Sequence, residues 1–276
     1  MQGIDDLLDC TQDRIRCTTV MGGTTVEKPP PLQRNRPSER ARLAQVARRV
    51  MVGWLLVALA FWGWYLAFHQ FTPQFLYYDL MFGLVGAPLW FNRRRVARTL
   101  QAWRLNATVK FLLLGYGMVL LEEVFAAFAN HLSEGFSLPL LLVRIGQFWA
   151  LNVLAFTGLI VGWAILMPLI GFSRAEAFWL IGVWGLYAEH TILALPGNPL
   201  AFLFIAPLNI FVYGLILAPA VLSRPETPTP ARRLPWIARY PLALLAPFVL
   251  SILPVALLVS LRTRYSGVFP PRKFVA

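Results

Sequence analysis

Long apolar runs, separated by short polar segments, dominate the chain from residue 50 onwards. A helix needs about 20 mostly apolar residues to cross the hydrocarbon core of a bilayer. Seven segments meet this pattern, at 50–71, 75–91, 107–131, 137–171, 176–195, 200–222 and 240–261. The pattern predicts an all-α fold: a polytopic helical membrane bundle over residues 50–261 with about seven transmembrane spans.

For two of these segments, the pattern does not determine how the chain crosses the bilayer. Segment 137–171 is longer than one upright helix requires at about 1.5 Å per residue. We expect one crossing preceded by an interfacial or re-entrant stretch from Pro139 to Gly146, because two crossings would move the basic segment 223–239 to the outside. The last span contains three prolines that either lie in one crossing or break it into a hairpin returning to the cytoplasm, namely Pro241, Pro247 and Pro254.

Composition and charge support the membrane interpretation. The chain is 58% hydrophobic and 14% charged, whereas a soluble domain averages about 25% charged residues. The net charge of +12 is compatible with a nucleic-acid binder until the positions of the arginines are considered. They cluster before the first span, after the second and after the sixth, while the loops at 70–74, 132–136 and 196–199 contain no Lys or Arg. This positive-inside pattern predicts a cytoplasmic N-terminus and makes nucleic acid an unnecessary partner. The expected contacts are the lipid bilayer and anionic headgroups on the cytoplasmic face; the sequence identifies no protein partner.

The two ends of the chain differ from the bundle. Residues 1–49 contain both cysteines and the cluster KPPPLQRNRP but no periodic apolar face, which predicts a disordered basic cytoplasmic tail. Residues 262–276 are expected to form a short polar tail. No apolar h-region follows the start, so the first span is the expected targeting signal. The expected location is the cell membrane, as a multi-pass protein of the bacterial plasma membrane.

A few charged residues lie inside the predicted spans. They are Asp79, Glu122, Glu123, Arg144, Glu189 and His190, accompanied by the neutral polar residues Asn130, His131, Asn152 and Asn209. A charge at the bilayer centre costs roughly 2.5–3.5 kcal/mol on insertion scales, so such residues usually face the protein interior and often mark function. Lys110 differs, because it lies near a helix end from which it is expected to snorkel to the surface.

Depth and helical phase suggest that some of these residues meet. Glu122 and Glu123 lie about 15 residues into their span, and the pair at 189–190 about 14 into its own, so both pairs are expected a little over 20 Å from the cytoplasmic side. Asn209, Arg144 and Asp79 also belong to the outer half. Each acid shares its helical face with small residues: Glu189 with Gly182 and Gly185, Asp79 with Gly83 and Gly86, and Glu123 with Ala127. Small residues permit close helix contact, so we expect the acids to point inward.

The residue types match a catalytic zinc site. Zinc of this kind takes three protein ligands and a water molecule, which a free carboxylate can deprotonate. In this hypothesis Glu122 and Glu123 are catalytic, one of them also serving as a ligand, and Glu189 and His190 bind the metal. Asn209, Arg144 and Asp79 play supporting roles.

Three short motifs carry a family resemblance: LLEEVFAAFA at 120–129, GLYAEHTI at 185–192 and APLNIF at 206–211. They resemble the glutamate-dependent intramembrane proteases of the CAAX-prenyl-protease and bacteriocin-processing clan, and the related PrsW-like proteins. The resemblance implies a membrane-embedded hydrolase acting through the paired glutamates. Ala127 stands where one branch of the clan has arginine, and the final histidine of the clan has no counterpart on the last two spans.

Other functions fit the same residues. A proton- or cation-coupled carrier would use titrating carboxylates, and the interruptions LPGNP at 195–199 and APLN at 206–209 are typical of broken transporter helices. A scaffold or assembly factor would need only the basic face, which suits anionic headgroups. The polar residues could also serve packing alone, with Glu122 or Glu123 paired to Arg144, Asp79 bonded to Tyr77 or Tyr78, and Asn209 bonded to a carbonyl freed by Pro207.

Overall fold

The computed structural model describes residues 39–68, 73–132, 135–225 and 234–266, and within these ranges the regular elements are all helices. The chain divides into two compact units, Met1–Ala44 and Gln45–Ala276. The helical bundle and the candidate site belong to the second unit. The cysteines and the proline cluster of the predicted tail lie outside the described residues.

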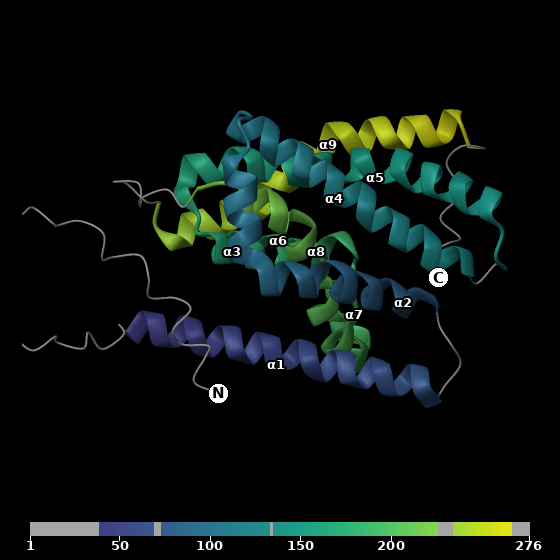
Figure 1. The fold of residues 1–276 in the computed structure, drawn as a ribbon, viewed down its shortest axis with the longest axis horizontal. Coiled ribbons are helices and arrows are strands. Elements are labelled where there is room, and N and C mark those ends of the chain that lie inside the picture. The colour runs from purple at the N-terminus through teal and green to yellow at the C-terminus, as the bar shows by residue number, and fades with distance from the viewer. Residues whose placement is uncertain (1–38, 69–72, 133–134, 226–233, 267–276) are drawn as a thin grey trace, which may run out of the picture. The chain divides into compact units, whose positions relative to one another are not determined.

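The helices follow the apolar segments closely (Figure 1). In chain order they are α1 (Glu39–Phe68), α2 (Pro73–Leu80), the π-helical η2 (Met81–Gly86), α3 (Ala87–Ala102), α4 (Ala107–Leu132), α5 (Leu138–Leu166), the π-helical η3 (Met167–Gly171), α6 (Arg174–Ala188), α7 (Thr191–Gly197), α8 (Pro199–Ser223) and α9 (Trp236–Arg264). Helix α1 begins ten residues before the predicted end of the tail at residue 49, and α9 ends at Arg264, where the polar tail is expected.

The protein is a multi-pass membrane protein. Among the described residues, five helices are long and apolar enough to cross a bilayer, namely Gln45–Phe68, Ala107–Leu132, Leu138–Gly171, Pro199–Ser223 and Ile237–Arg264. Helices α6 and α7, bent by 64° at their junction, make a sixth if the pair is counted as one span. The segment predicted as a span at 75–91 is divided among α2, η2 and α3 and is not one of these candidates.

Two predicted interruptions are absent from the helices concerned. Of the two forms expected for the stretch from Pro139 to Gly146, interfacial or re-entrant, the re-entrant form is wrong, because α5 is continuous from Leu138. Pro139 lies in its first turn, where a missing N–H removes no intrahelical hydrogen bond. Of the two courses left open for the last span, the hairpin at Pro241, Pro247 and Pro254 does not form, since α9 runs through all three prolines. Membrane helices tolerate such prolines because neighbouring groups satisfy the freed carbonyls.

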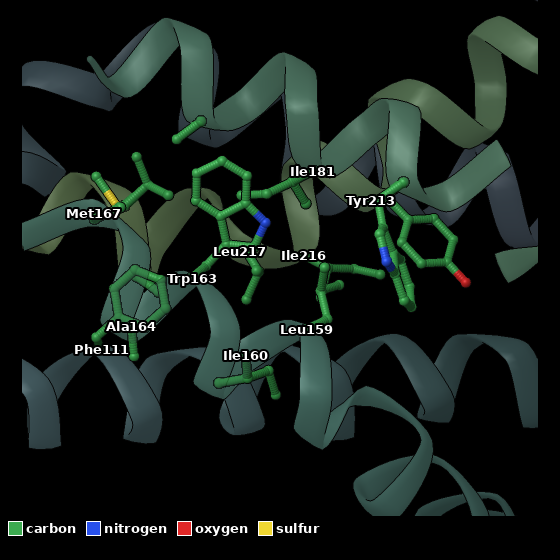
Figure 2. Close-up of a cluster of buried hydrophobic side chains, with 14 of the residues drawn as sticks. Phe111, Leu159, Ile160, Trp163, Ala164, Met167, Ile181, Tyr213, Ile216 and Leu217 are labelled. Atoms are coloured by element: carbon green, nitrogen blue, oxygen red, sulfur yellow. The ribbon is translucent and has the colours of Figure 1, made fainter. Parts of the chain in front are cut away.

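The interior of the bundle is a tightly packed apolar cluster. Figure 2 shows side chains from α4, α5, α6 and α8 meeting there, including Phe111, Leu159, Ile160, Trp163, Ile181, Ile216 and Leu217. Glycines allow the backbones to approach: a Cβ on Gly182 would lie 2.3 Å from the carbonyl oxygen of Ile210, and one on Gly185 would lie 2.4 Å from the Tyr213 ring. Packing of this kind, rather than water exclusion, holds membrane helices together.

Lys110 is buried instead of snorkelling to the surface. Its Nζ donates hydrogen bonds to the carbonyl oxygens of Leu100 at 2.9 Å, Gln101 at 3.3 Å and Trp103 at 3.1 Å. These carbonyls belong to the last turn of α3 and its exit, where the helix has no N–H groups left to pair them. A cation also suits the negative end of a helix dipole. Lys110 therefore caps α3 and ties it to the start of α4.

We expect Lys110→Met to lower the free energy of unfolding by about 2–3 kcal/mol. The methionine retains the apolar stem but leaves three carbonyls without their charged donor, and hydrogen bonds to charged groups contribute roughly 1.5–3 kcal/mol. Chemical unfolding in detergent micelles measures the change. Lys110→Arg, which restores a donor, serves as the control. A Met variant as stable as the parent would show that the carbonyls do not depend on the lysine.

Candidate functional site

A cavity of about 190 Å³ lies among α4, α5, α6 and α8. Its walls are Glu122 and Glu123 from α4, Asn152, Ala155 and Phe156 from α5, Trp184 and Ala188 from α6, Glu189 at the end of α6, and Tyr213 from α8. The structure thus brings three of the sequence-predicted site residues to one space. None of the residues lining this cavity is Lys, Arg or His.

Glu122 and Glu123 reach the cavity although adjacent helical side chains point about 100° apart. Both are buried, at 6% and 3% exposure. Glu122 turns towards α2, where its Oε1 accepts a hydrogen bond from the Tyr77 hydroxyl, and its side chain also hydrogen-bonds with that of Glu123. Glu123 turns towards α5 and hydrogen-bonds with the side chain of Asn152. The cavity lies where these two directions diverge.

Glu189 approaches the cavity from the end of a helix. Its backbone N–H donates to Gly185 and closes α6, and its Oε1 accepts a hydrogen bond from the Tyr213 hydroxyl. Figure 2 shows this hydroxyl directed away from the other labelled core residues, so the Tyr213 ring packs in the core while its polar tip serves the site. Glu189 itself is exposed. The cavity therefore has a buried carboxylate pair on one side and an exposed carboxylate on another.

His190 does not join the cavity. The sequence predicts one continuous span over 176–195, whereas the chain leaves the helix at Glu189 and turns at His190, whose φ of 53° is left-handed. This turn produces the bend between α6 and α7 and places His190 at an exposed position. A left-handed conformation is uncommon for a residue with a Cβ and carries some strain.

Asn209 is buried beside the bend instead of in the cavity. Its Oδ1 accepts from the Tyr78 hydroxyl at 2.8 Å, and its Nδ2 donates to Oγ1 of Thr191 at 2.5 Å. Asn209 thus fixes the first residue of α7 against α2.

The carbonyl freed by a helical proline is satisfied by a different group from the one predicted. Leu203 lies four residues before Pro207. Proline has no backbone N–H, so the Leu203 carbonyl receives no hydrogen bond from within the helix. It accepts from Nε1 of Trp54 at 2.7 Å. The suggested hydrogen bond from Asn209 to such a carbonyl is therefore wrong, because the donor is a side chain of α1.

The remaining supporting residues lie apart from the cavity lining. Asp79 is exposed, and a Cβ added to Gly83 on the same face would meet no atom within 4 Å, so the expectation that this face packs inward is wrong at both residues; only Gly86 packs closely, where a Cβ would lie 3.1 Å from the Leu215 side chain. The tyrosine hydroxyls suggested as partners of Asp79 donate to Glu122 and Asn209 instead. Arg144 donates to Oε1 of Gln147 on its own helix at 3.2 Å.

The described residues do not fit the predicted zinc site. No group of three His, Cys, Asp or Glu side chains in the described ranges is arranged to hold a metal ion. The α6 helix ends at Glu189 and the chain turns at His190. His190 therefore does not line the cavity with the carboxylates that were expected to share the metal with it.

Sequence reasoning missed the aromatic half of the site. Tyr77 and Tyr213 supply hydroxyl donors to the carboxylates, and Trp184 forms part of the wall. Aromatic residues are frequent throughout this chain and commonly form belts at membrane interfaces, so no spacing singled these three out. For the contact of Gly185 with the Tyr213 ring, the sequence indicated only the small-residue face on this helix and not the partner residue.

Comparison with known proteins adds no relative. No protein-family model matches the chain, and neither curated proteins nor solved structures give a match.

Proposed function

We propose that this membrane protein is a proton- or cation-coupled carrier and that the cavity is its coupling site. The observation that carries the proposal is the convergence of Glu122, Glu123 and Glu189 on one cavity whose lining contains no cationic side chain. Unpaired carboxylate charges are costly at membrane depth. Three of them around so small a space require protons or a bound cation, and exchange between the two couples their movements.

The division of the carboxylates suits such an exchange. Glu189 is exposed and gives an arriving cation its first contact, whereas Glu122 and Glu123 are buried. The hydroxyls of Tyr77 and Tyr213 each donate to one carboxylate oxygen and hold the side chains in place. The remaining oxygens can then take up either a proton or a cation.

The broken helix supports the same function. Glu189 lies at the junction of α6 and α7, where the chain bends by 64°. In membrane carriers, interrupted helices place unwound backbone and helix ends at the ion site, and they allow the two halves to move separately. Asn209 and Thr191 fix the start of α7 on the far side of this junction.

The arginines at one end of the bundle support an orientation for the site. Arg174 donates to the carbonyl of Arg224, Arg224 donates to the carbonyl of Ala164, and Arg239 forms an ion pair with Glu176. These contacts gather the start of α6 and α9 with the ends of α5 and α8. We propose that this arginine-bearing end faces the cytoplasm and anionic headgroups, and that the cavity opens on the opposite side.

The test is a pH jump on proteoliposomes adsorbed to a solid-supported membrane, without added solute. Proton binding in the cavity should produce a transient displacement current. A triple variant, with Glu122, Glu123 and Glu189 each replaced by Gln, should lose this current while inserting into the liposomes at the same density. A wild-type response no larger than that of protein-free liposomes would refute the coupling site.

A second function is favoured by the carboxylate pair. Glu122 and Glu123 are both buried and both line the cavity, and a carboxylate in such a place can accept a proton from an attacking water as a general base. This is the chemistry that the resemblance to glutamate-dependent intramembrane proteases implies. Cleavage of a co-reconstituted fluorogenic transmembrane peptide, lost in Glu123→Gln, would establish the hydrolase in place of the carrier. An uncleaved peptide in the presence of a pH-jump current would exclude it.

A further inference from the structure

We propose that the solute of this cavity is a small organic ammonium ion carrying an oxygen acceptor, an inference that rests on the carrier function proposed above. The ammonium group would bind the carboxylates and lie against an aromatic wall. The oxygen would accept a hydrogen bond from Trp184.

The aromatic wall distinguishes this cavity from a site for an inorganic cation. Phe156, Trp184 and Tyr213 all line it. The ring centroids of Phe156 and Tyr213 are 5.5 Å apart with nearly parallel planes, and those of Trp184 and Tyr213 are 6.0 Å apart. Ring faces attract organic cations, whereas a hard metal ion prefers a shell of oxygen ligands. No group of metal-ligating side chains sufficient for such an ion is present in the described part of the chain.

One buried polar atom of the lining residues lacks a partner. Nε1 of Trp184 has no hydrogen-bond partner among the described residues, and Trp184 is only 6% exposed. Buried polar groups are normally hydrogen-bonded, so this N–H calls for an acceptor. The carboxylates of the same lining call for a cation. A solute with an ammonium group and a neighbouring oxygen satisfies both.

The size of the cavity limits this solute. Its volume is about 190 Å³. Pockets for drug-sized ligands span roughly 300–1,000 Å³. The cavity therefore suits an ion of a few non-hydrogen atoms, for which protonated 2-aminoethanol is a direct probe.

The first experiment compares three concentration jumps at constant pH on the reconstituted protein. Protonated 2-aminoethanol should give a saturable displacement current. Sodium at the same concentration and ethylene glycol, the neutral isostere of the probe, should give at most one tenth of it. Equal responses to sodium and to the probe, or none to the probe, would overturn the inference.

The second experiment tests the aromatic contact. Trp184→Leu removes the ring and should raise the half-saturating concentration of protonated 2-aminoethanol about tenfold. Trp184→Phe keeps a ring face but lacks the N–H, and should raise it about threefold. Trp163→Phe is the matched control, because Nε1 of Trp163 is likewise buried without a partner among the described residues, but Trp163 lies in the apolar core and not in the cavity lining. Equal half-saturation in the Trp163 and Trp184 variants would remove Trp184 from the binding site.

The two proposals fail differently. A pH-jump current without a response to the ammonium probe would overturn this inference and leave the coupling site standing. Loss of both responses in correctly inserted wild-type protein would overturn the carrier function itself.

Discussion

Glu123→Gln is expected to reduce the pH-jump displacement current of the reconstituted protein at least about tenfold while leaving its unfolding temperature close to that of the parent. Glu123 is buried, lines the cavity and hydrogen-bonds with Asn152. The amide preserves side-chain size and can keep a hydrogen bond with Asn152, so the packing around it should persist. It cannot exchange a proton or neutralise a cation, so the coupling step should be lost.

Asp79→Asn is the matched control for this substitution. Asp79 also lies in the transmembrane region predicted from the sequence, but it is exposed and is not part of the cavity lining. Its amide variant should retain the full current. If Glu123→Gln were as silent as Asp79→Asn, the paired glutamates would serve packing alone.

Gly182→Leu is expected to have the largest effect on stability, with a loss of about 3 kcal/mol or more of the free energy of unfolding, or no folded protein at all. Even the first carbon of a side chain at this position would lie 2.3 Å from the backbone oxygen of Ile210. Backbone atoms cannot rotate away as a flexible side chain can, so α6 and α8 must separate. Overpacking of a well-filled interior commonly costs about 1–3 kcal/mol, and a forced separation of backbones costs more.

The same substitution should also dismantle the cavity, because Glu189 directly follows α6 and its hydrogen-bond donor Tyr213 belongs to α8. Thermal unfolding and the displacement current measure the two effects on one sample. Gly117→Leu is the matched control, since Gly117 lies in a predicted span, on α4, and has no atom within 4 Å of an added Cβ. Similar losses in the two variants would show that the cost comes from replacing a helical glycine and not from the α6–α8 contact.

Several features of the bundle were accessible from the sequence because they depend on local properties of the chain. Apolar runs of span length predict helices, since a backbone in lipid must satisfy its own hydrogen bonds. The small residues Gly182 and Gly185 indicated a close helix contact, which the structure places between α6 and α8. The two glycines do not line the cavity, because the side of α6 on which they lie is packed against α8.

The depth of each acid within its span was also accessible from the sequence, because it depends on one helix alone. Counting residues from the cytoplasmic end of each span suggested one level for Glu122, Glu123 and Glu189, and all three line the same cavity. Such counting works because the rise per residue of a helix is fixed at about 1.5 Å. Counting could not show that His190 stays outside the cavity, because the left-handed turn at this residue places it at an exposed position.

The sequence by itself determined that this is a helical membrane protein and where its apolar helices lie along the chain, because hydropathy and helical rise are properties of each segment alone. Only the tertiary structure decided which groups meet. The bond from Tyr213 to Glu189 and the bond from Trp54 to the carbonyl freed by Pro207 join different helices, and Lys110 caps α3 from the start of the next helix. An unpaired carbonyl or carboxylate can be satisfied by any donor within reach, and the packing of the helices determines which donor that is.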